Sequence, residues 1–249
     1  MRLYVYCLGD GLAESAFEGV AGVGGAPARV LALGALSAVV SDAAEEPAPV
    51  TEENLLAHNR VNAAALALTT PLPFRFGTLA APERLAEYAR SNEAALAAAL
   101  ARVRGRVEMS VKLLEKAEGP KAKAGSEEGG AGAQETSPGE AAPRGVGRGT
   151  AFLLRKRREV LGEESARRRA EELAAWLAEG LRGLAVETSA SLSPAEAIVV
   201  RAAHLVERGR VGEYRRRLRA LGAERDGLRL LSSGPWPPYS FSDVRRTTD

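Results

Sequence analysis

The sequence predicts an α+β protein of two domains, an N-terminal α+β domain and a C-terminal ferredoxin-like (βαββαβ) domain with a disordered insertion. Two observations support this fold class. Strand-like segments alternate with stretches of helical periodicity along the 249 residues. From residue 103 onward the expected order is strand, helix, strand, strand, helix, strand, which is the ferredoxin-like order. We expect the domains at 1–101 and 102–233, followed by a Pro/aromatic segment and tail at 234–249.

The first strand is expected at residues 3–8, which are aromatic and β-branched without a breaker. A glycine-rich stretch follows at 9–27. It has neither a G-x-G-x-x-G frame nor a Gly-Lys-Ser/Thr sequence, so it predicts a turn-rich loop and not a nucleotide-binding loop. Two short strands near 29–33 and 36–41 form a hairpin around Gly34.

Two helices complete the N-terminal domain. Thr51 is an N-cap candidate for a helix that extends to about residue 69, because acidic residues follow it directly. Two prolines then end this helix. Residues 74–79 are expected to be a short extended segment, and a second helix is expected at about 82–100 with Pro82 in its first turn.

Residues 103–115 alternate between apolar and polar side chains, which predicts a half-buried strand. Gly105 marks a bulge or a bend at its start. The residues expected on the buried face are Val103, Val107, Met109, Val111 and Leu113. The residues expected on the solvent face are Arg102, Arg104, Arg106, Glu108, Ser110 and Lys112.

The composition changes at about 117–147, where Gly, Ala, Pro, Ser, Glu and Lys dominate. Such a segment buries too little apolar surface to offset the entropy of ordering it. We therefore expect a disordered insertion in the first crossover of the C-terminal domain, where added length costs little.

The rest of the C-terminal domain follows from periodicity. A helix is expected at about 150–182, strands at 184–190 and 196–206, a helix at 209–222 ending at its glycine, and a last strand at 228–232. The buried stripe of the long helix is expected to consist of Leu173, Leu177, Leu181 and Leu184.

Composition argues against several classes of protein. The chain has one cysteine and two histidines, which disfavours a disulfide framework and a His/Cys zinc site. Cys7 lies in a strand expected to be buried, and His58 and His204 accompany no nucleophile motif. No apolar stretch has the length of a membrane helix. We therefore expect no enzyme activity, no cofactor, no metal and no membrane association, in a cytoplasmic protein.

Three arginine-rich runs leave a second interpretation open, an RNA- or polyanion-binding module that uses basic helices. They lie at 155–158, 167–169 and 215–217. RNA-binding modules of ferredoxin-like type stack bases on aromatic side chains of their central strands. The strands at 103–115 and 196–206 offer no aromatic pair. We therefore favour helix faces that are solvated or meet a protein partner, and expect no nucleic acid.

Two segments are candidates for partner contact or for forming a groove. The first segment, Phe74–Gly77, either packs its phenylalanines in the core, with a glycine needed for a turn, or presents an interaction edge around its arginine. The second segment, Trp236–Phe241, is forced by its prolines into an extended path. Its aromatic side chains either pack across an interdomain groove or present a ledge to a partner. The candidate residues are Phe74, Arg75, Phe76 and Gly77, and Trp236, Pro237, Pro238, Tyr239 and Phe241.

The order of several motifs resembles that of a known family. The quoted motifs are Leu3-Tyr4-Val5-Tyr6, Leu36-Ser37-Ala38-Val39-Val40-Ser41, His58-Asn59, Pro73-Phe74-Arg75-Phe76-Gly77-Thr78, Val107-Glu108-Met109-Ser110-Val111-Lys112, Gly149-Thr150-Ala151-Phe152-Leu153 and Gly234-Pro235-Trp236-Pro237-Pro238-Tyr239-Ser240-Phe241. In this order and spacing they resemble the GvpL/GvpF family of gas vesicle proteins.

The resemblance implies an accessory or minor structural protein of gas vesicle assembly. Such a protein would bind the small, very apolar shell protein and limit its aggregation during nucleation. Its implied partners are the shell protein and other gas vesicle accessory proteins, and its implied location is the cytoplasm and the gas vesicle. The family brings no catalytic residues and no cofactor.

Overall fold

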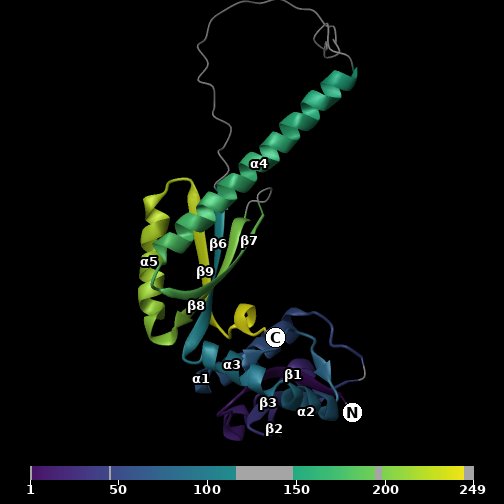
Figure 1. Ribbon diagram of the computed structural model, residues 1–249. Coiled ribbons are helices and arrows are strands. Elements are labelled where there is room, and N and C mark those ends of the chain that lie inside the picture. The colour runs from purple at the N-terminus through teal and green to yellow at the C-terminus, as the bar shows by residue number, and fades with distance from the viewer. Residues whose placement is uncertain (1, 45, 116–147, 194–197, 244–249) are drawn as a thin grey trace, which may run out of the picture.

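The chain has a mixed α+β fold with two antiparallel sheets, seen in the computed structural model (Figure 1). The structure describes residues 2–44, 46–115, 148–193 and 198–243. The insertion expected at 117–147 lies outside these residues.

The first sheet has the strand order β2-β3-β1-β4, with β5 also paired to β1. Its central strand is nearly completely buried, because aromatic and β-branched side chains fill both of its faces. The hairpin around Gly34 is confirmed, with a positive φ of 81° at the glycine. The strands are β1 (Arg2–Gly9), β2 (Arg29–Leu33), β3 (Leu36–Ala43), β4 (Leu72–Pro73) and β5 (Leu79–Ala80).

The helices of the N-terminal part are α1 (Glu52–Leu68), α2 (Pro82–Ser91) and α3 (Glu93–Val103). Thr51 caps α1 as predicted, since its side chain accepts a hydrogen bond from the backbone of Asn54 (3.2 Å). The single helix expected at 82–100 is wrong. It breaks at Asn92, whose side chain donates to the carbonyl of Tyr88 (2.8 Å) and competes with helical bonding.

The second sheet has the strand order β7-β8-β6-β9, and every neighbouring pair is antiparallel. Gly105 makes a bend between α3 and β6 with a φ of 70°, so Val103 ends the helix and does not begin the strand. The strands are β6 (Arg106–Glu115), β7 (Ala185–Leu192), β8 (Ile198–Glu207) and β9 (Leu228–Trp236).

Helices α4 (Arg148–Gly180) and α5 (Val211–Glu224) cover one face of this sheet (Figure 1). The four leucines of the predicted stripe are buried, but α4 ends at Gly180, so Leu181 and Leu184 lie in the turn that follows it. Leu177 and Leu181 share a core cluster with Leu218 and Leu221 of α5. Helix α5 passes through Gly222 and ends at Glu224, so the glycine does not end it.

The two sheets are joined by a common apolar core. One cluster contains Leu3 and Val5 of β1, Leu96 of α3 and Leu205 of β8, together with Phe241 from the C-terminal segment. Polar contacts join the same parts of the molecule. Arg208 donates to the carbonyl of Leu66 at 2.7 Å, and Thr70 donates to the carbonyl of Arg106 at 3.1 Å. Residues from both halves of the chain therefore hold the two sheets together.

Candidate functional site

The segment Phe74–Thr78 is a turn between β4 and β5, and the extended segment expected at 74–79 is wrong for most of its length. Both ends of the turn are attached to β1. The N–H of Phe74 donates to the carbonyl of Tyr6 at 2.8 Å, and the N–H of Val5 donates to the carbonyl of Thr78 at 3.0 Å. Within the turn, Thr78 Oγ1 donates to the carbonyl of Arg75 at 2.7 Å. The turn is thus held against the central strand.

Gly77 has a φ of 83°, a conformation that side-chain-bearing residues rarely adopt, so the predicted need for glycine in this turn is confirmed. Its N–H donates to Tyr4 Oη at 2.8 Å. The two phenylalanines pack on different clusters. Phe74 lies against the cluster that contains Phe241, and Phe76 lies against the cluster that contains Tyr4. Both are partly buried, so they fix the turn from two sides.

The C-terminal segment runs from the end of β9 into the space between the two sheets. β9 continues to Trp236, which pairs with Glu108 beyond a register shift, so the strand extends further than predicted at 228–232. Pro237 and Pro238 are buried and lead to a short 3₁₀ turn, Tyr239–Phe241. The Phe241 side chain is 2% exposed in the shared core. Its carbonyl accepts a hydrogen bond from the Arg102 guanidinium of α3.

Glu108 anchors the segment to β6. Its Oε2 accepts from the backbone N–H of Ser240 at 2.7 Å, and its Oε1 accepts from Ser240 Oγ at 3.1 Å. Burial raises the pKa of this carboxyl, which is 5% exposed. The expectation that Glu108 faces solvent is therefore wrong, because the C-terminal segment covers this end of the strand.

His58 joins the C-terminal segment to the first sheet. Its Nδ1 lies 3.1 Å from Tyr4 Oη, and its Nε2 lies 3.1 Å from Tyr239 Oη. Burial lowers the pKa of His58 to about 4, so the ring is neutral at pH 7. A neutral imidazole has one N–H and one acceptor nitrogen, so each ring nitrogen can bond one hydroxyl. His58 therefore acts as a bridge between two tyrosines.

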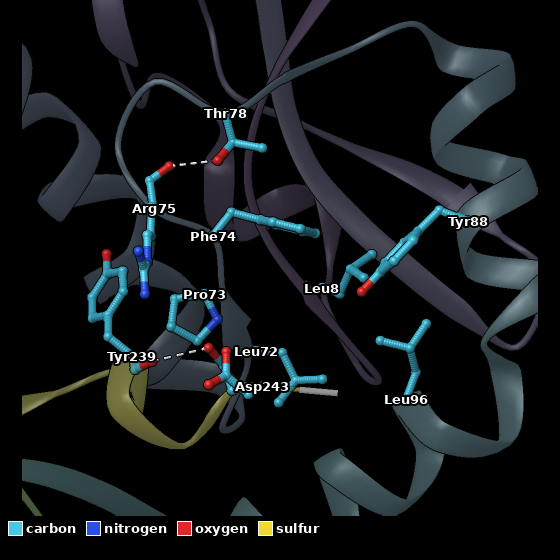
Figure 2. Close-up of a pocket in the computed structure, with 11 residues that line it drawn as sticks. Leu8, Leu72, Pro73, Phe74, Arg75, Thr78, Tyr88, Leu96, Tyr239 and Asp243 are labelled. Atoms are coloured by element: carbon cyan, nitrogen blue, oxygen red, sulfur yellow. Dashed lines mark hydrogen bonds between the residues drawn. The ribbon is translucent and has the colours of Figure 1, made fainter. Parts of the chain in front are cut away.

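The turn and the C-terminal segment meet at one pocket of about 310 Å³ (Figure 2). Phe74, Arg75 and Tyr239 line it together, and Leu8, Tyr88 and Leu96 contribute apolar surface. In Figure 2 the Arg75 side chain extends from the turn toward the Tyr239 ring. The remaining lining residues are Leu72, Pro73, Thr78, Ser242 and Asp243.

Arg75 is exposed at this pocket and forms no salt bridge with any residue that the structure describes. The pocket therefore combines apolar side chains with polar ones, including the Asp243 carboxylate, and with the Arg75 cation. Such a site can hold apolar side chains and attract a neighbouring carboxylate.

The other candidate residues lie outside this pocket. Trp236 is 40% exposed on β9, and its Nε1 donates to Ser233 Oγ at 3.2 Å. The turn is held in place by Phe76 and Gly77, and the C-terminal segment by Phe241. The structure thus brings Phe74, Arg75 and Tyr239 together and separates Trp236 from them.

Sequence reasoning missed His58 and Glu108 as the residues that hold the segment. The signals for His58 were its place in a quoted family motif and its polar character within an alanine-rich helix. Glu108 carried no such signal, because it stands in a regular polar alternation.

The one cysteine and the two histidines of the chain are buried. Burial raises the pKa of the Cys7 thiol to about 12 and lowers the pKa of His204 to about 4. In the described part of the chain, His, Cys, Asp and Glu form no group of three or more that could hold a metal ion. Among its helices, none combines the length and apolar character needed to cross a bilayer.

The arginine runs are partly engaged inside the molecule. Arg167 pairs with Glu171 at 3.0 Å, and Arg217 pairs with Glu224 at 2.9 Å. Arg215 donates to the carbonyl of Gly234. The side chains of 155–158 lie outside the described residues.

The architecture is that of an α+β protein in which a C-terminal aromatic segment is inserted between two antiparallel sheets. The same fold occurs in crystal structures of the gas vesicle protein GvpF. The structure from Anabaena sp. PCC7120 matches with a TM-score of 0.76 at 19% identity, over 98% of this chain and 97% of that one. The structure from Microcystis aeruginosa matches with a TM-score of 0.74 at 19% identity, over 97% of this chain and 99% of that one.

A family model, gas vesicle synthesis protein GvpL/GvpF, matches residues 2–243. Gas vesicle protein L of Streptomyces sp. (strain CB03234) is 31% identical over 250 residues, which cover 91% of this chain and 87% of that protein. The chain belongs to the GvpL/GvpF family, as its motifs predicted. Its role is therefore related to gas vesicles, and this family is not a known enzyme family.

Proposed function

We propose that the protein is an accessory or minor structural protein of gas vesicle assembly that binds the apolar shell protein and limits its aggregation during nucleation. Newly made shell subunits expose apolar surface, which drives aggregation unless a partner covers it. Other gas vesicle accessory proteins are further partners in this proposal, and the protein acts in the cytoplasm and at the gas vesicle.

One observation supports the pocket beside Arg75 as the binding site for the shell protein. Two segments far apart in the sequence, each a candidate for partner contact, line the same pocket through Phe74, Arg75 and Tyr239. The pocket has room for one or two apolar side chains of a shell subunit. The unpaired Arg75 would orient that subunit through a carboxylate, a contact that weakens as salt is added.

The proposed architecture is two domains, with bounds at 1–101 and 102–233 and a C-terminal segment at 234–249. The second unit is ferredoxin-like in this proposal. Its element order β6-α4-β7-β8-α5-β9 and its strand order β7-β8-β6-β9 support that description. The C-terminal segment then lies between the domains and presents Tyr239 to the pocket.

Co-expression of this chain with its shell protein, followed by size-exclusion chromatography of the soluble fraction, tests the function. The proposal predicts a soluble complex that forms only when both proteins are present. Arg75→Glu should reduce the complex, whereas Arg60→Glu on the exposed side of α1 should leave it unchanged. If the shell protein aggregates equally with and without this chain, direct binding of the shell protein is wrong.

A further inference from the structure

Residues of α5 and β9 line a groove of about 760 Å³. β9 is the edge strand of the second sheet, at the opposite edge from β7. β9 pairs with β6 alone among the described strands, so the backbone along its outer edge is open. Leu218, Leu228 and Leu230 provide the apolar part of the lining. An open strand edge beside an apolar groove is a surface to which an extended chain can be added.

Three arginines flank this groove, Arg215 and Arg219 from α5 and Arg229 from β9. All three are exposed, and none forms a salt bridge within the described residues. The nearby carboxylates of Glu213 and Glu224 are engaged elsewhere, by Arg210 at 3.0 Å and by Arg217 at 2.9 Å. The groove therefore carries uncompensated positive charge, which is complementary to an acidic partner.

Gly222 of α5 keeps the groove open. A Cβ built at this position would meet only Leu230 Cδ1 at 3.8 Å, which is ordinary contact, so packing does not require glycine there. The position also does not require a positive φ, because it lies within a regular helix. Glycine is unfavourable in a helix interior. Its presence leaves space between the helix and the strand that a side chain would fill.

We propose that this groove binds an extended, acidic segment of a partner protein, which pairs with the free edge of β9. The segment's backbone bonds to the Leu228–Ser232 edge, its apolar side chains enter the groove, and its carboxylates face the three arginines. Alternation of side chains along a strand allows one short segment to satisfy both requirements. The groove lies apart from the Arg75 pocket, so the proposal does not depend on how the shell protein is bound.

A protein segment fits this surface better than a nucleic acid. Single-stranded nucleic acids are held by stacking their bases on aromatic side chains. The groove is lined by leucines, arginines, Gly222 and Ser232, and by no aromatic residue. Leucines and an open strand edge instead match the apolar side chains and backbone of a peptide.

Binding of a fluorescent peptide of about seven alternating Glu and Val residues to the intact protein tests the proposal. We expect saturable binding that weakens with salt. Gly222→Leu should fill the groove and abolish binding without lowering the unfolding temperature. Gly212→Leu is the matched control, since Gly212 lies in the same helix but does not line the groove. Absence of peptide binding up to millimolar protein, or equal binding by the two leucine variants, would overturn the proposal.

Two further measurements separate the contributions of charge and backbone. Arg219→Glu combined with Arg229→Glu should lower the affinity for the peptide by roughly tenfold or more. Arg60→Glu should leave that affinity unchanged. A peptide with alternate N-methylated amides should not bind, because it cannot pair with a strand edge. Undiminished binding of that peptide, or tighter binding of a single-stranded RNA that Gly222→Leu also abolishes, would contradict a strand-addition site.

Discussion

The Nε2 atom of His58 lies 3.1 Å from the hydroxyl of Tyr239, although 181 positions separate the two residues. This contact holds the C-terminal segment against α1 and the first sheet. The Glu108–Ser240 hydrogen bonds hold the same segment against the second sheet. One short segment is therefore attached to both sheets, and it carries the tyrosine that lines the pocket beside Arg75.

Tyr239→Phe removes one hydroxyl from the bridge, while Asn62 Nδ2 stays 3.1 Å from the same nitrogen of His58. We expect a loss of about 0.5–1.5 kcal/mol in the free energy of unfolding, the usual contribution of one hydrogen bond. Urea denaturation measures it. Tyr88→Phe is the control, because the Tyr88 side chain is 36% exposed and should change stability by less than about 0.5 kcal/mol. Equal midpoints for the two variants would contradict the bridge.

Phe241→Ala leaves a cavity in the core shared by the two sheets, because its side chain is 2% exposed. The expected loss in the free energy of unfolding is about 3–5 kcal/mol. Trp236→Ala removes a larger but 40% exposed side chain and should cost about 1 kcal/mol or less. Thermal unfolding monitored by circular dichroism compares the two. A larger loss for Trp236→Ala would show that the segment is not held as described.

The buried His58 predicts a loss of stability in acid. Its pKa is lowered from the ordinary 6.5 to about 4 by burial. Above pH 6.5 neither state binds the proton, and between pH 6.5 and 4 the unfolded chain binds it more. The free energy of unfolding should therefore fall as the pH drops through this window and level off below it. The total loss from this group is about 2–3 kcal/mol.

Urea titrations at pH 7.5 and pH 4.5 test this on wild type and His58→Gln. The variant should lose less stability between the two conditions, although His204, with a similarly lowered pKa, titrates in both proteins. Burial raises the pKa of Glu108 and contributes in the opposite direction in both. An identical pH dependence would show that His58 is not the group responsible.

Gly234 of β9 lies close to the backbone of Glu108 in β6. Its φ is 118°, and a Cβ there would come within 2.7 Å of the carbonyl oxygen of Glu108. Gly234→Ala should therefore cost at least about 2 kcal/mol, because both the backbone strain and the contact oppose it. Gly19→Ala isolates the strain, since Gly19 has a φ of 73° with nothing within 4 Å. If the two variants are equally stable, the close approach is not rigid.

Local signals predicted much of the fold. A threonine cap located the start of α1, a glycine located the β2–β3 hairpin, and a leucine stripe located the buried face of α4. The break at Asn92 was missed because periodicity continues across it. The burial of Glu108 was missed because it depends on contact with the distant C-terminal segment.

The candidate site shows the same limit. Sequence motifs indicated both the turn and the C-terminal segment, but their meeting at one pocket depends on packing between residues far apart in the chain. Trp236 stood in the motif and lies outside the pocket, because the strand β9 continues through it and turns its side chain to the surface.

Site-specific photo-crosslinking tests most directly whether the pocket beside Arg75 contacts the shell protein. Tyr88 lines the pocket and is 36% exposed, so a photo-crosslinking amino acid at this position would face any bound partner. Leu56 of α1 is 54% exposed, does not line the pocket and serves as the control position. The account predicts a crosslink to the co-expressed shell protein from position 88 that Arg75→Glu weakens. Crosslinks from position 56 alone, or equal yields from both positions, would contradict it.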